Sequence, residues 1–229
     1  ENYVDHVRRF VHNEKAKQLY YDHVRNIVTR VNTVTGEPYA EDPTIFSWQI
    51  GNEPRAFARD SLTKTAFHDW MCQSAALIKS LDSNHMVSSG SEGLYGCEVD
   101  LDLFEKIHAD ENFDYLNIHI WPYNWSWVRE NTLNENLPVA IANTDKYIND
   151  HLAIAEKYGK PVVLEEFGFP RDGFQFAQGT PTTARDEYYR HVFGRIAESA
   201  AEGGLFAGLN FWGWGGLAGQ SDTNIYWQP

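Results

Sequence analysis

The chain has 229 residues, a formal net charge of −13, and a composition that is 42% hydrophobic and 14% aromatic. Nucleic acids and anionic membranes favour basic surfaces, so this charge argues against both as partners and is compatible with a neutral polymer. The length and the apolar content are enough for one domain with a sizeable core.

The first part of the chain predicts a helix, a strand and a second helix, in that order. Apolar residues recur at helical spacing from Glu14 to Val34, and Thr35-Gly36 is a suitable C-terminal signal. A strand is expected to begin at Ile45. It should end near Glu53, because the proline that follows lacks an N–H for a sheet ladder. A second helix is expected from about Leu62 to Leu81, where an apolar stripe indicates core packing.

The remaining elements alternate strand and helix. This order predicts an α/β fold with parallel strands, and five strands are expected to end near Glu53, Ser89, Trp121, Glu166 and Trp212. Pro181 stands where it would open the first turn of the last helix. The elements expected after Leu81 are a strand at 86–89, a helix at 100–109, a strand at 115–121, a helix at 141–158, a strand at 162–166, a helix at 182–201 and a strand at 205–212.

The strand that leads to Glu53 has two different faces. Because side chains alternate along a strand, Glu53 would share a polar face with Gln49, while Phe46, Trp48 and Ile50 form an apolar face. This pattern is typical of a barrel strand whose apolar face lies under a helix and whose polar face leads to a carboxylate at the C-terminal mouth.

A second run, from Pro161 to Gly168, also ends in acid and glycine. Two glutamates at two strand ends are what a glycosidase needs: one protonated acid beside the leaving oxygen, and one ionised nucleophile or base. Alternation favours Glu166 over Glu165 as the inward residue. The alternative reading is that Glu53 and Glu166 are capping or salt-bridged side chains just beyond strands, but two such ends together with many aromatic residues favour the glycosidase.

The same alternation places His119 and Trp121 on the inward face of their strand. It also groups Gly208, Asn210 and Trp212 on the last strand. The loop from Trp121 to Trp127 contains three tryptophans and a tyrosine within seven residues, and it is too aromatic for one helical stripe. We therefore expect several of its rings to line a groove.

Four motifs carry a resemblance to a known family. They are Asn52-Glu53-Pro54-Arg55, His119-Ile120-Trp121, Glu166-Phe167-Gly168 and Phe211-Trp212. With them, nearly the whole chain resembles glycoside hydrolase family 5, most closely its endo-β-1,4-mannanases. The resemblance implies a (β/α)8 TIM barrel in which residues 1–229 are part of one catalytic domain and supply about strands four to eight. The first three strands would then precede Glu1, on the same polypeptide or on another chain.

The resemblance also implies roles for the residues around the two glutamates. Glu53 would be the general acid/base and Glu166 the nucleophile of a retaining enzyme. Asn52 would bind the 2-hydroxyl of the sugar that is cleaved, and Arg55 the sugar beyond the leaving oxygen. Glu92, in a glycine-bearing loop, is a candidate subsite residue or else a solvent-exposed glutamate.

The resemblance also implies roles for a histidine and three tryptophans. His119 would hold the two glutamates in their working arrangement, and Trp212 would be the platform under the sugar at the cleavage point. Trp121 stands where the family more often has a tyrosine, and its indole N–H can donate a hydrogen bond but never accept one. Trp125 is expected to bind substrate from the aromatic loop.

These features predict a retaining endo-β-1,4-mannanase that acts on mannan, glucomannan or galactomannan and is secreted to an extracellular or periplasmic location. No metal or other cofactor is expected, because the nine histidines are scattered and the two cysteines stand apart. Two alternatives stay open: an endo-β-1,4-glucanase of the same family, and an incomplete, non-catalytic carbohydrate-binding fragment.

Overall fold

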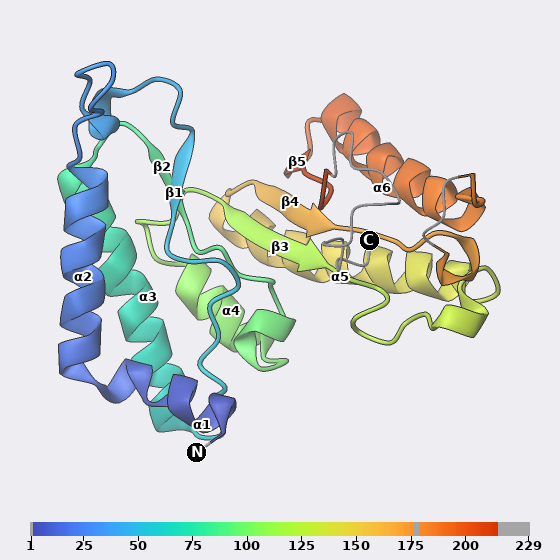
Figure 1. Ribbon diagram of the computed structural model, residues 1–229, viewed down its shortest axis with the longest axis horizontal. Coiled ribbons are helices and arrows are strands. Elements are labelled where there is room, and N and C mark those ends of the chain that lie inside the picture. Colours follow the sequence, from blue (N-terminus) through green and yellow to red (C-terminus); the bar gives the residue numbers. More distant parts are fainter. Residues whose placement is uncertain (1, 176–178, 215–229) are drawn as a thin grey trace. The chain divides into compact units, whose positions relative to one another are not determined.

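A computed structural model describes residues 2–175 and 179–214 of the chain (Figure 1). The fold is α/β, with helices and strands alternating along most of the described sequence. The chain divides into two compact units, Glu1–Asn117 and Ile118–Pro229. Among the described residues, no helix combines the length and the apolar character that a membrane crossing requires.

The first unit is built on two short parallel strands. Strand β1 pairs with β2 in a register that sets Ser47 opposite Met86 and Gln49 opposite Ser88. Helices α2 and α3 pack against each other, and α3 packs against β2. The elements of this unit are α1 (Tyr3–Arg8), α2 (Glu14–Val28), β1 (Ser47–Gln49), α3 (Ser61–Leu81), β2 (Met86–Ser88) and α4 (Leu101–His108).

Each described α-helix of the first unit has an asparagine or aspartate as its N-cap residue. The side chain of Asn2, Asn13, Asp60 or Asp100 accepts a hydrogen bond from the backbone N–H three residues later, which satisfies one of the unpaired donors of a helix start. Hydrogen bonds from the backbone and side chain of Thr63 lower the pKa of the exposed Asp60 carboxyl. Helix α3 runs over Ser61–Leu81, close to the predicted range.

Helix α2 ends at Val28, six residues before the predicted end. The reason is a turn centred on Asn32, whose Oδ1 accepts hydrogen bonds from the backbone N–H groups of Val34 and Thr35. Such local side-chain bonds compete with helix hydrogen bonds. Val34 is apolar and fits the helical spacing, but its side chain is 91% exposed.

The apolar face predicted for the first strand is only partly buried. Ile50 is buried, and the half-buried Trp48 donates its indole N–H to Asp82 Oδ2 at 2.7 Å. Phe46 is 71% exposed, so the prediction that it lies under a helix is wrong for the part of the chain that the structure describes. Strand β1 starts at Ser47, and Phe46 precedes it.

Three strands form the sheet of the second unit. Their order is β3-β4-β5, β4 pairs with β5 in parallel, and the arrows of β3 and β4 point the same way in Figure 1. Helix α5 packs against β4 and helix α6 against β5. The elements are β3 (Leu116–Ile120, which starts at the end of the first unit), α5 (Leu137–Tyr158), β4 (Val162–Phe167), α6 (Thr183–Glu202) and β5 (Phe206–Leu209).

Both long helices of this unit end at a glycine with positive φ, Gly159 for α5 and Gly203 for α6. This is the left-handed cap that glycine adopts without strain. Pro181 precedes the N-cap residue Thr182, so it does not occupy the first turn of α6 as predicted. Inside the unit, the Phe169 ring stacks on Tyr188, whose hydroxyl lies 2.8 Å from Thr144 Oγ1.

Candidate active site

The segment after β1 is hydrogen-bonded to the segment after β2, and this pairing positions Glu53. The backbone N–H of Ile50 donates to Ser88 O, and that of Glu53 donates to Gly90 O at 2.9 Å. Glu53 itself has a φ of +49°, so it lies beyond the strand in a left-handed conformation. A side chain at Gly90 would collide with Gly51 O, because an added Cβ would lie 1.8 Å from that atom. Glycine is therefore required where the two segments meet.

Asn117 clamps the loop that follows β2. Its Oδ1 accepts hydrogen bonds from Ser88 Oγ at 2.6 Å, Ser89 Oγ at 2.8 Å and the N–H of Gly90 at 3.0 Å, while its Nδ2 donates to Ser91 O at 2.9 Å. The Asn117 side chain is fully buried. One amide thus satisfies four polar groups of the loop on which Glu53 rests, which fixes that loop.

Arg55 and Glu92 meet in an ion pair. Arg55 donates from Nε to Glu92 Oε2 at 2.5 Å, and its Nη2 contacts the same oxygen. Glu92 is only 3% exposed, which rules out the alternative reading of a solvent-exposed loop glutamate, whereas Arg55 is 34% exposed. Two donors on one carboxylate hold the plane of the guanidinium group.

A cavity of about 320 Å³ opens beside these residues within the first unit. Asn52, Glu53 and Arg55 line it. Three of the four site residues predicted in this unit are therefore brought together at one cavity, and the fourth, Glu92, holds Arg55. The cavity is also lined by Tyr3, Val7 and Phe57, none of which was predicted from the sequence.

In the second unit, Glu166 lies next to His119. Glu166 is on β4 and His119 on the neighbouring strand β3, and the distance from His119 Nδ1 to Glu166 Oε2 is 3.5 Å. The histidine side chain is 2% exposed and the glutamate side chain 17%. The structure therefore brings His119 and Glu166 together, and the catalytic roles of both residues stay predictions. The separation of the Glu53 and Glu166 carboxyls, which belong to different units, stays a prediction.

Two tryptophans accompany this pair. Trp121, directly after β3, and Trp212, after β5, contact each other edge to face, with ring centroids 5.8 Å apart. A hydrogen bond from the N–H of Trp212 to Phe167 O, 2.9 Å long, fixes the chain beyond β5 against the end of β4. A Cβ at Gly168 would lie 2.7 Å from Trp121 Cζ3, so the glycine of the Glu-Phe-Gly motif makes room for this ring.

The last strand pairs with β4 through a shift of register. The ladder between β4 and β5 shifts register after Val162, and Gly208 pairs with Val163. A Cβ on Gly208 would face the Val163 side chain at 3.4 Å, so Gly208 belongs to that face of the sheet and not to the face of Glu166. The bulge lies before Gly208, and regular pairing resumes with Leu209 opposite Leu164. The grouping of Gly208 with Asn210 and Trp212 stays a prediction.

Trp125 lies in an aromatic cluster beside helix α5. Its ring centroid is 5.1 Å from that of Trp127 and 5.1 Å from that of Tyr147. A separate cavity of about 740 Å³ is lined by other residues of the same loop, including Tyr123 and Asn124. Its predicted role in substrate binding stays a prediction.

Sequence reasoning missed the residues that act through packing. Asn117 and Gly90 both stood in segments that were singled out, but nothing local showed that the amide would clamp the loop. Tyr3 and Phe57 are separated by more than fifty positions and gave no signal. Cys72 and Cys97 are both free thiols, and burial raises the pKa of Cys97 to about 12.

The arrangement within each unit suits reactions at a sugar. The first unit presents a half-buried carboxyl group with an exposed amide and a fixed guanidinium, and the second presents a carboxyl group with a histidine and two indole rings. A family model described as GH family 5 beta-mannosidase-like matches residues 1–229. The chain belongs to this family.

Curated relatives in glycoside hydrolase family 5 agree with that assignment. Mannan endo-1,4-beta-mannosidase 1 of Arabidopsis thaliana is 31% identical over 227 residues, covering 91% of this chain and 52% of the relative. Mannan endo-1,4-beta-mannosidase 3 of the same plant is 34% identical, covering 89% of this chain and 50% of the relative. The chain thus spans about half the length of the curated relatives that it matches.

Solved structures are similar over the same extent. A glycoside hydrolase family 5 mannosidase from Rhizomucor miehei matches with a TM-score of 0.79 and 31% identity, covering 93% of this chain and 51% of that one. The hyperthermostable endo-1,4-β-D-mannanase from Thermotoga petrophila matches with a TM-score of 0.71 and 27% identity, covering 95% of this chain and 59% of that one. Parallel strands and interleaved helices are shared features.

Proposed function

We propose that the protein carrying this chain is a retaining endo-β-1,4-mannosidase that hydrolyses mannan, glucomannan or galactomannan. The observation that supports this most is the position of Glu166, at the end of β4, beside His119. The Trp121–Trp212 pair at the end of the neighbouring strands adds an aromatic surface for a sugar. The names of the curated relatives favour mannan over the other polysaccharides.

In the proposed mechanism, Glu53 protonates the glycosidic oxygen while the Glu166 carboxylate attacks the anomeric carbon. The bond to the leaving sugar breaks, and a covalent glycosyl ester forms on Glu166. Glu53, now ionised, then removes a proton from a water molecule that attacks the same carbon and releases Glu166. Asn52 would hydrogen-bond the 2-hydroxyl, an interaction that strengthens in the transition state.

We further propose that the five strands β1 to β5 are the fourth to eighth strands of a (β/α)8 barrel. Strands β1 and β5 stand at the edges of their described sheets, and unpaired edges need a partner. The other three strands would come from the same polypeptide or from another chain. A neutral polysaccharide as substrate also suits an enzyme that is secreted to an extracellular or periplasmic location.

The test is hydrolysis of mannan, glucomannan and carboxymethyl cellulose by the protein that contains this chain. We expect endo-cleavage of the mannans, with the newly formed reducing end first seen by NMR as the β-anomer. Faster cleavage of the cellulose derivative would favour the endo-β-1,4-glucanase. Binding of mannan without turnover would favour the non-catalytic carbohydrate-binding fragment, and an initial α-anomer would exclude retention.

A further inference from the structure

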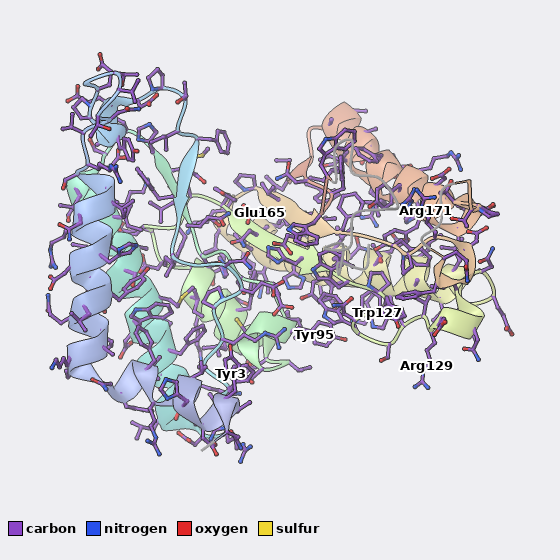
Figure 2. All side chains as sticks on the ribbon, viewed as in Figure 1. Tyr3, Tyr95, Trp127, Arg129, Glu165 and Arg171 are labelled. Atoms are coloured by element: carbon purple, nitrogen blue, oxygen red, sulfur yellow. The ribbon has the colours of Figure 1, made fainter. Side chains whose placement is uncertain are left out.

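The cavity beside Glu53 has an aromatic wall that the proposed mechanism does not use. Tyr3 of helix α1 and Phe57 both line it, and their rings meet edge to face with centroids 6.1 Å apart. The Tyr3 side chain is 73% exposed, and Figure 2 labels it at α1. A tyrosine this exposed contributes little to a core, so its ring is free to contact a ligand.

Hydrogen bonds tie this wall to the segment that carries Glu53. Arg8 of α1 donates from Nε to Phe57 O at 2.8 Å, and from Nη1 to Asp5 Oδ1 at 2.6 Å. Phe57 has a φ of +50°, a conformation that a residue with a large side chain seldom adopts unless its surroundings hold it. The short helix α1 is therefore anchored four residues beyond the glutamate, and its position is set together with that of Glu53.

The cavity is also lined by polar groups. Arg55 uses Nε and Nη2 to contact Glu92, which leaves Nη1 able to donate hydrogen bonds. Asn52 is exposed and adds an amide. A pyranose ring has an apolar C–H face and a rim of hydroxyl groups, so it matches a cavity that is lined by both aromatic rings and fixed donors.

We propose that Tyr3 and Phe57 form a sugar subsite on the leaving-group side, which takes a β-1,4-linked hexopyranose of the substrate beyond the bond that is cleaved. This inference rests on the proposed function, in which Glu53 delivers its proton to the leaving oxygen. The sugars that occupy the cavity of Glu53 and Arg55 are then those that depart. The subsite adds binding energy only for substrates long enough to extend past Arg55.

The experiment compares two substrates in the protein that contains this chain. Mannohexaose can extend along the leaving-group side, whereas 4-nitrophenyl β-mannobioside places only an aryl group there. For Tyr3→Ala we expect kcat/KM to fall about tenfold with mannohexaose and to stay within about twofold with the aryl substrate. Tyr3→Phe keeps the ring and should retain most of the activity. Leu19→Ala, which removes a 62% exposed apolar side chain from α2, is the matched control.

An equal loss on both substrates, or no loss on either, would overturn the subsite. The melting temperature of each variant shows whether the fold is intact, and Phe57→Leu replaces Tyr3→Ala if that variant unfolds. A wild-type protein that cleaves neither substrate would refute the proposed function, and binding then decides the subsite alone. In that case mannotriose should still bind more weakly to Tyr3→Ala than to wild type by calorimetry, and equal affinity would reject the inference.

Discussion

The Trp121 ring packs directly over the backbone of Gly168, so that a Cβ at position 168 would lie 2.7 Å from Trp121 Cζ3 and 3.1 Å from Trp212 O. A contact below 3 Å forces one of the partners to move, and here that partner is the large Trp121 ring, while the Trp212 carbonyl is also in tight contact. The glycine that follows the proposed nucleophile by two residues therefore sets the position of both tryptophans.

Gly168→Ala should displace the Trp121 ring and weaken the aromatic surface beside Glu166. We expect a loss of about tenfold or more in kcat/KM on mannan, together with a change in tryptophan fluorescence. Gly194→Ala is the matched control, because nothing lies within 4 Å of its added Cβ in helix α6. That control should keep full activity and gain roughly 0.5–1 kcal/mol of stability. Unchanged activity in Gly168→Ala would contradict the packing argument.

Asn117→Ala should destabilise the first unit. The substitution leaves the N–H of Gly90 and the carbonyl of Ser91 without the side-chain partner that they have in the structure. Buried polar groups that lose their partners cost free energy, and for this clamp we expect a loss of about 3 kcal/mol in the free energy of unfolding. Urea denaturation measures it. The exposed Asn124→Ala should change stability by less than about 0.5 kcal/mol, and an equally small effect of Asn117→Ala would refute the clamp.

Stability should fall as the pH drops from about 6.5 to 4, in part because of His151. Burial in helix α5 lowers the pKa of His151 to about 4, and its Nδ1 donates to Tyr147 O at 2.6 Å. Below the unfolded-state pKa of about 6.5, the unfolded chain binds a proton that the folded chain excludes, so folding loses up to roughly 3 kcal/mol by pH 4.

His151→Phe removes this titration while keeping an aromatic ring. Its free energy of unfolding, measured by urea denaturation across that window, should therefore decline less steeply than that of the wild type. His23→Gln, at an exposed position on α2, is the control and should follow the wild-type curve. Parallel curves for wild type and His151→Phe would show that the histidine is not the cause.

Chemical rescue assigns the roles of the two glutamates. Glu53→Ala should lose hydrolysis of the polymer but still cleave aryl mannosides with good leaving groups, which need no protonation. Azide should restore turnover in this variant and give a β-glycosyl azide, because it attacks the ester on Glu166 from the face that water uses. Should the β-product arise from Glu166→Ala instead, the roles of acid/base and nucleophile are exchanged.

The distance between the Glu53 and Glu166 carboxyls is the geometric counterpart of that assignment. We expect roughly 5–5.5 Å, the separation of retaining glycosidases. A crystal structure of the complete protein measures it. A separation of about 6.5–9.5 Å would indicate inversion, and carboxyls on opposite faces of the fold would end the proposal.

Much of the secondary structure was predictable because burial leaves a periodic trace in the sequence. The apolar stripe of α3 and the apolar run of β4 both reflect one consistent environment along the element. Prediction failed where a local feature interrupts the period. Asn32 ends α2 early through its own hydrogen bonds, and β1 starts only at Ser47, so that Phe46 precedes the strand and is exposed.

The sequence by itself determined which residue types stand at the ends of the strands, and so it gave Glu53, Glu166 and His119 as candidate site residues and placed the chain with its family. Only the tertiary structure decided that His119 lies 3.5 Å from Glu166 and that Tyr3 shares a cavity with Glu53. These contacts join positions about fifty residues apart. Periodicity reports how each segment meets its surroundings, whereas the partner across a contact depends on how the segments pack together.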